Sequence, residues 1–145
     1  MAAERGRELR VGANAFIIAR DSEAEAREVH AEIVAKADPA AIAGFAEAVK
    51  QAGQSTSDGV GNWSKSKAAD LVQPNDGFKT NLIGTPEQVA RRIVTLKRAG
   101  IDLVLAGFLH FQEEVEYFGR RVYPLVRELE AEATRRDLRQ IVSAS

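Results

Sequence analysis

Three short apolar runs, each followed by a helix-forming segment, constrain the fold of this chain most strongly. The runs are 10–19, 80–84 and 101–107, and none has the stripe of an amphipathic helix. Strands that alternate with amphipathic helices build a parallel sheet whose strands are joined by right-handed crossovers. The order of the runs therefore predicts an α/β domain with three parallel strands.

Two of the predicted helices begin at specific capping patterns. Ser22 and Glu25 have capping-box spacing, and so do Thr85 and Gln88, with Pro86 at the first helical position. A side-chain oxygen at the first residue of such a pair accepts a backbone N–H that the helix leaves unpaired. These patterns predict where the helices after the first and second strands start.

The chain is interpreted as a single domain, 1–145, with four segments. The segment 6–53 holds the first strand and two helices, and 54–78 is expected to be a mobile loop insertion with a short helix inside 63–72. The last two strand–helix units occupy 79–130, where Pro124 should interrupt the final helix at about Tyr123. The charged tail 131–145 is expected to be exposed or frayed.

Composition excludes several classes of function. Lys and Arg number 20 against 21 for Asp and Glu, so the balance gives no electrostatic case for a nucleic-acid or membrane partner. No apolar run is long enough to span a bilayer, and Met1–Arg10 does not have the pattern of a secretory signal. The absence of cysteine fits a cytoplasmic location, and with two histidines no metal site is expected.

Three ordered blocks resemble one family. Gly84–Leu109, GTPEQVARRIVTLKRAGIDLVLAGFL, resembles the last βαβ unit of the luciferase-like flavin-dependent monooxygenases. The blocks GRELRVGANAFIIARDSEAEA and GFLHFQEEVEYFGRRVYPLVREL resemble the sixth strand and the closing strand with its terminal helix. The two-component alkanesulfonate and dimethyl sulfone monooxygenases are the most similar subgroup. The resemblance implies a partial (β/α)8 TIM barrel, about the last three strands with their helices and a long loop insertion.

For the complete enzyme, the resemblance implies a monooxygenase that oxidises a small organosulfur compound, such as dimethyl sulfone, with O2. Reduced FMN (FMNH2) would be its co-substrate, supplied by a separate NAD(P)H-dependent flavin reductase. Because exposed parallel strand edges seek partners, a homo-oligomer or an N-terminal barrel partner is expected. Two alternatives remain open: an inactive barrel fragment that acts as an oligomerisation or interaction module, and a fragment complemented by a separate N-terminal chain.

Candidate site residues follow from the rule that parallel barrels bind ligands at the carboxyl ends of their strands. Asn14 and Phe16 point the same way, because side chains alternate along a strand. The related sulfonate enzymes carry Arg and His there, so Asn and Phe favour a neutral sulfone. The alternatives are that Asn14 hydrogen-bonds a neighbouring strand and that Phe16 belongs to the core.

Three further candidates lie in loops. The resemblance implies that the loop after the last strand lines the active-site mouth, with an aromatic side chain at Phe108. His110 is the candidate catalytic residue, because a histidine transfers protons near neutral pH; alternatively, it caps the last helix. Trp63 lies in the insertion that the resemblance places over the barrel mouth, and it is predicted to contact flavin or, alternatively, to pack within the loop.

Two other features are interpreted as exposed to solvent. His30 lies on a charged helix, and Glu113, Glu114 and Glu116 resemble a carboxylate cluster but fit the solvated face of an amphipathic helix. No nucleophile triad and no metal-ligand spacing stands out in the sequence.

Overall fold

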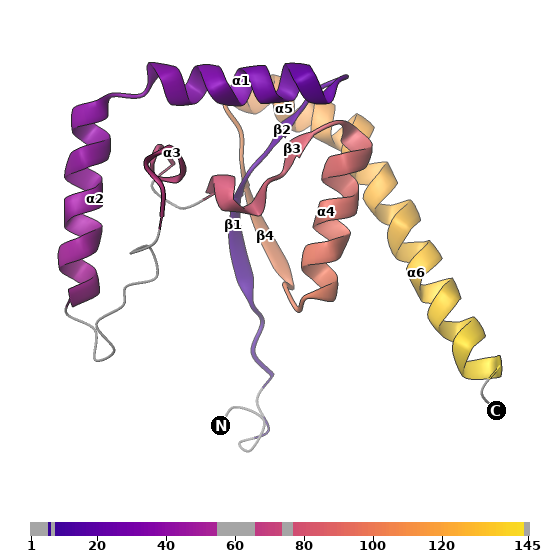
Figure 1. The fold of residues 1–145 in the computed structure, drawn as a ribbon. Helices are drawn as coiled ribbons and strands as arrows, with labels where there is room; N and C mark the ends of the chain where they lie inside the picture. The colour runs from indigo at the N-terminus through magenta and orange to yellow at the C-terminus, as the bar shows by residue number, and fades with distance from the viewer. Residues whose placement is uncertain (1–5, 7, 55–65, 74–76, 144–145) are drawn as a thin grey trace.

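The computed structural model describes residues 6, 8–54, 66–73 and 77–143 (Figure 1). Its elements are, in order, β1 (Gly12–Phe16), β2 (Ile18–Ala19), α1 (Glu23–Lys36), α2 (Pro39–Gln54), α3 (Ala68–Leu71), the 3-10 helix η2 (Gly77–Thr80), β3 (Ile83–Gly84), α4 (Pro86–Arg98), β4 (Leu103–Gly107), α5 (Phe111–Tyr117), the π-helix η3 (Phe118–Val122) and α6 (Tyr123–Ser143). The mixed α/β fold class is confirmed. Within the described residues, no helix combines the length and apolar character needed to cross a membrane.

All strand pairs are parallel, as predicted. β1 pairs with β4 from Gly12↔Leu103 to Phe16↔Gly107, and β2 pairs with β3 at two positions. The first apolar run is thus one strand interrupted at Ile17, whose N–H still donates to the carbonyl of Gly107 at 2.9 Å. This strand lies between β4 and β3.

The order of the strands differs from that of three consecutive strands in a barrel. An arc of consecutive barrel strands would place β3 in the middle. Here the first strand is in the middle: β4 pairs with Gly12–Phe16 on one edge, and the two residues of β3 pair with its carboxyl end on the other. The predicted strand 80–84 was too long: Thr80 closes η2, and Asn81 has a positive φ of 51° that breaks the extended conformation before Leu82.

The helix starts agree with the capping patterns. The Oγ of Ser22 accepts from the N–H of Glu25 at 3.1 Å. The Oγ1 of Thr85 accepts from the N–H of Gln88 at 3.4 Å, and the Oε1 of Gln88 accepts from the N–H of Thr85 at 2.9 Å. The short helix expected inside 63–72 is α3, and Trp63 lies outside the described residues.

The final helix differs from the prediction in two ways. The interruption expected near Tyr123 is a π-helical turn, in which the N–H of Tyr123 donates to the carbonyl of Phe118. Because Pro124 has no N–H to donate, the turn before it widens and the helix continues into α6. The tail is therefore helical to Ser143 instead of frayed, and the side chains described in it are mostly exposed, as predicted.

Two apolar clusters lie on opposite faces of the first strand. Ala15, Ile17 and Ala19 belong to a cluster with buried residues of α4, η3 and α6. Phe16 and Ile18 point the other way, into a cluster with Ala26 of α1, Phe78 of η2 and Ile83 of β3. In Figure 1, α4 and α6 flank one side of the sheet, while α1 crosses the carboxyl ends of the strands. The alternation explains the apolar run Ala15–Ala19, since both faces of this part of the strand are covered.

One part of the sheet is uncovered. Leu103 and Leu105 of β4 are 64% and 66% exposed, and they share their face with Asn14, the cross-strand partner of Leu105. The cluster around Phe78 covers this face only where it reaches Phe16. The amino-terminal half of the β1–β4 pair therefore presents an open apolar face, defined here by Asn14, Leu103 and Leu105.

Candidate functional site

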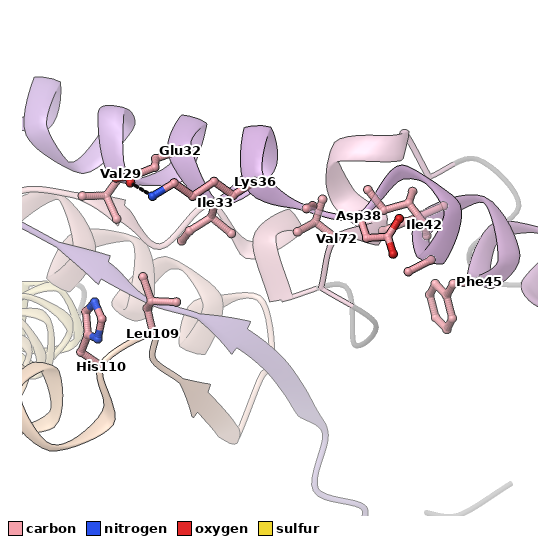
Figure 2. A pocket seen from close by; sticks show the side chains of 13 residues that line it. Val29, Glu32, Ile33, Lys36, Asp38, Ile42, Phe45, Val72, Leu109 and His110 are labelled. Carbon is pink, nitrogen blue, oxygen red and sulfur yellow. Dashed lines mark hydrogen bonds and ion pairs between the residues drawn. The ribbon is translucent and has the colours of Figure 1, made fainter.

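A cavity of about 620 Å³ lies beside the turn that follows β4 (Figure 2). Its walls are mostly apolar and come from α1, α2, the end of α3 and that turn; they include Val29, Ile33, Ile42, Phe45, Val72 and Leu109. Cavities of this size with a few polar groups are typical of small-molecule sites. Its place at the carboxyl end of a parallel strand is where such folds bind their ligands.

The polar groups of the cavity are few. The ammonium of Lys36 donates to the carboxylate of Glu32, and this hydrogen bond lowers the pKa of Glu32 (Figure 2). Asp38 uses its Oδ1 to accept from the N–H of Ala40 at 2.8 Å, at the start of α2. His110 is the N-cap residue of α5, but its ring makes no capping hydrogen bond, so the capping alternative does not hold for the side chain. The imidazole instead borders the cavity.

A partly buried ion pair holds the turn that carries His110. Nη2 of Arg20 donates to Oε1 of Glu114 at 2.5 Å. The other oxygen, Oε2, accepts from the N–H groups of Leu109 and His110 at 2.8 and 3.2 Å. One carboxylate thus connects the end of the first strand, the turn after the last strand and α5.

A second tie lies beside this pair. The hydroxyl of Tyr117 donates to Oδ1 of Asp21 at 2.8 Å, and the guanidinium of Arg121 lies 5.6 Å from the centre of the Tyr117 ring. Burial, together with the hydrogen bond to Asp21, raises the pKa of Tyr117 to about 12. The phenol is therefore a hydrogen-bond donor at neutral pH, and it links the start of α1 to α5.

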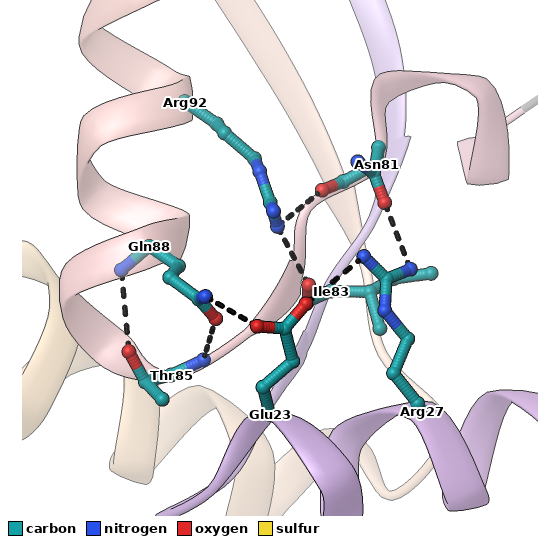
Figure 3. Close-up of polar contacts among 7 residues, drawn as sticks. All are labelled: Glu23, Arg27, Asn81, Ile83, Thr85, Gln88 and Arg92. Atoms are coloured by element: carbon teal, nitrogen blue, oxygen red, sulfur yellow. Dashed lines mark hydrogen bonds and ion pairs between the residues drawn. The ribbon is translucent and has the colours of Figure 1, made fainter.

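The amino ends of α1 and α4 are joined by their own network (Figure 3). Nε2 of Gln88 donates to Oε2 of Glu23 at 2.6 Å, while Oε1 of the same side chain completes the capping box with Thr85. The hydrogen bond from Gln88 is the largest cause of the lowered pKa of Glu23. The polar groups at this helix start are thus engaged by the protein itself.

Asn81 is the second centre of that network. Arg27 of α1 donates to its side-chain oxygen at 3.0 Å. Arg92 of α4 donates to the carbonyl oxygens of Asn81 and Ile83, at 2.9 and 2.6 Å. These contacts satisfy the carbonyl groups of a segment too short to form a longer strand (Figure 3).

Of the predicted site residues that the structure describes, His110 alone lines the cavity. Asn14 is exposed on the open face. Phe16 is buried, with its ring centre 5.1 Å from that of Phe78, which is the position that the core alternative described. Phe108 is half-buried and packs edge-on against Phe118 at 5.9 Å. Contacts of these side chains with flavin or substrate stay predictions, and Trp63 lies outside the described residues.

Two residues expected to face solvent do not. His30 is half-buried, its ring centre lies 4.6 Å from that of Phe78, and burial lowers its pKa from 6.5. Glu114 is 8% exposed, whereas its neighbours Glu113 and Glu116 are exposed as predicted. A signal was present for Glu114: Arg20 directly follows a buried strand, and a cation at that position needs a partner.

Comparison with known proteins gives one family. The family model described as luciferase-like monooxygenase matches residues 1–103. The chain is 66% identical over 131 residues to the FMNH(2)-dependent dimethylsulfone monooxygenase of Pseudomonas putida, covering 90% of this chain and 36% of that protein. It is also 66% identical over 125 residues to the protein of the same name from Pseudomonas fluorescens (strain Pf0-1), covering 86% and 34%.

A more distant relative is the sulfoquinovose monooxygenase of Novosphingobium aromaticivorans, which is 28% identical over 134 residues and is covered over 37% of its length. The chain therefore spans about a third of the length of the curated relatives that it matches.

Proposed function

We propose, from the premise that this chain belongs to the luciferase-like monooxygenase family, that it forms the C-terminal part of an FMNH2-dependent dimethyl sulfone monooxygenase. The family resemblance read from the three sequence blocks is confirmed. The observation that carries the proposal is the 66% identity to two dimethylsulfone monooxygenases over almost the whole chain. The complete enzyme takes reduced FMN from a separate flavin reductase, uses O2, and works in the cytoplasm.

The open face supports a partial barrel that the rest of the relatives' fold would close. Leaving Leu103 and Leu105 about two-thirds exposed forgoes about 1–2 kcal/mol for each side chain. Strands corresponding to the relatives' N-terminal part would bury them, whether that part is on the same polypeptide or a separate one. The alternative is an oligomerisation or interaction module, in which a second copy covers the same face.

The cavity suits one side of a flavin ring. The isoalloxazine is flat and mostly apolar, and the walls from Ile33, Val72 and Leu109 match it in character. Reduced flavin, when bound, supplies the electrons with which O2 is activated, and the protein orients it and excludes water. In this proposal Leu109 excludes water, His110 exchanges a hydrogen bond or proton with the bound molecules, and Asn14 offers a neutral polar contact to a sulfone.

Reconstitution tests the proposal. The chain is co-expressed with the N-terminal part of the P. putida relative that it does not cover, and the mixture receives FMN, NADH, a flavin reductase and dimethyl sulfone. Loss of dimethyl sulfone, followed by NMR, is expected when both parts are present and not with either part alone. A folded complex that leaves dimethyl sulfone unchanged would overturn the proposal.

Light scattering of the chain alone separates the alternatives. A stable dimer that excludes the N-terminal part from the complex favours the oligomerisation module. Oxidation of dimethyl sulfone by the chain alone would show that no further part is needed.

A further inference from the structure

We infer that Glu114 is a positioning residue of this site, whose carboxylate sets the place of His110 by holding the backbone of the turn after β4. The inference rests on the proposed function insofar as the cavity beside that turn is the ligand site. The contacts themselves come from three separate elements of the fold, namely the end of β2, the turn and α5.

The burial of Glu114 requires an explanation. Among the described residues, it is the one charged side chain in the buried class, at 8% exposure. A carboxylate removed from water is costly unless an opposite charge and hydrogen-bond donors surround it. The other carboxylates of this helix stay at the surface: Glu113 is exposed, and Glu116 forms an exposed ion pair with Arg120 at 2.5 Å.

Each oxygen of Glu114 has a different task. Oε1 receives Nη2 of Arg20, and Nη1 of that guanidinium donates to the carbonyl of Ala19 at 2.8 Å, so the cation is anchored to the end of β2. Oε2 receives the two N–H groups of Leu109 and His110. In the usual capping box, the side chain three positions after the N-cap residue accepts a hydrogen bond from one backbone N–H, that of the N-cap residue. Here Glu114, four positions after the N-cap residue His110, accepts hydrogen bonds from two backbone N–H groups.

The consequence concerns the cavity wall. Leu109 and His110 both line the cavity, and their backbone is held by this carboxylate on one side. The N–H of Glu114 also donates to the carbonyl of His110 at 2.9 Å, so both backbone polar groups of His110 bond to Glu114. Glutamine has the same length but one acceptor oxygen, and its NH2 group would face the NH2 group of Arg20. The variant Glu114→Gln therefore loses the ion pair in either orientation of its amide, and its single oxygen can accept from Arg20 or from the turn but not from both as the carboxylate does.

The experiment compares three variants of the full 145-residue chain with the unaltered chain. Glu114→Gln is the test, and Glu113→Gln is the matched control that removes the same charge from the next, exposed position. Val94→Ala is a stability control: Val94 is a core residue with 6% exposure, so its replacement destabilises the core and leaves the turn residues unaltered. Thermal unfolding is measured for all of them. Backbone amide and imidazole NMR signals report on Leu109 and His110, and quenching of flavin fluorescence reports the Kd for oxidised FMN.

Glu114→Gln is expected to move the amide signals of Leu109 and His110 upfield and to shift the His110 ring signals, while Glu113→Gln and Val94→Ala leave them in place. Where the unaltered chain binds FMN, Glu114→Gln should weaken binding about tenfold, like the loss of a residue that orients a metal ligand. Unchanged turn signals in Glu114→Gln, or the same changes in Val94→Ala, would overturn the inference. An unaltered chain that binds no FMN counts against the proposed flavin wall, while the NMR signals still decide the role of Glu114.

Discussion

Replacing Gly84 by alanine should destabilise the chain through a contact that can be identified beforehand. Gly84 ends β3 with a φ of +157°, and a Cβ built there would lie 2.3 Å from Oε1 of Gln88. That oxygen accepts the N–H of Thr85, and the amide of the same side chain donates to Glu23. The new methyl group therefore displaces the side chain that closes the capping box of α4 and ties it to α1.

Two contributions set the size of the effect. A side chain at this φ costs about 1–3 kcal/mol of backbone strain. Loss of the hydrogen bonds made by Gln88 adds about 1 kcal/mol. Gly84→Ala should thus lower the free energy of unfolding by about 2–4 kcal/mol, whereas Gln88→Ala alone should lower it by about 1 kcal/mol.

A double-mutant cycle in urea measures both terms. In the Gln88→Ala background, the cost of Gly84→Ala should fall to the strain alone, because the displaced side chain is already absent. The coupling between the two substitutions should therefore be about 1 kcal/mol. Strict additivity, or a Gly84→Ala chain within about 0.5 kcal/mol of the unaltered one, would refute this account of the contact.

Three further predictions concern burial. Because burial lowers the pKa of His30 below 6.5, the folded state prefers the neutral ring. The stability gained from the neutral ring is complete above pH 6.5 and is lost as the pH falls through the folded pKa. Urea midpoints measured across this range should therefore fall with pH in the unaltered chain, and this part of the fall should be absent in His30→Gln. Burial and the bond to Asp21 raise the pKa of Tyr117 to about 12, so an ultraviolet titration should show one tyrosine ionising there, and Asp21→Asn should lower that pKa while burial keeps it above 10.0. Val122 is 0% exposed, so Val122→Ala should lower the free energy of unfolding in urea by about 2 kcal/mol. Val115 is 38% exposed, so Val115→Ala should lower it by less than about 0.5 kcal/mol. Equal losses would contradict the assigned core.

Local sequence determined the existence of the elements and several of their ends. The caps at Ser22 and Thr85 act between residues three positions apart, so the sequence contains both partners of each hydrogen bond. The apolar runs identified the positions of the strands, although Asn81 shortened the second one. The three ordered blocks were also sufficient to indicate the family, because they preserve the spacing of strand and helix starts.

Tertiary structure decided which residues meet. Arg20 and Glu114 are 94 positions apart: the sequence indicates that Arg20 needs an anionic partner, but it does not indicate which carboxylate of the chain that partner is. The sequence also did not indicate that His30 and Phe16 both pack against Phe78. They meet because η2 folds back over the first strand.

The sequence did not show that His110 would line the cavity and Phe108 would not. That depends on the direction of the turn after β4, which the carboxylate of Glu114 sets. Periodicity and capping are short-range interactions that a sequence displays directly. The choice of a partner across the fold depends on how all elements share one core, and the three-dimensional arrangement alone determines it.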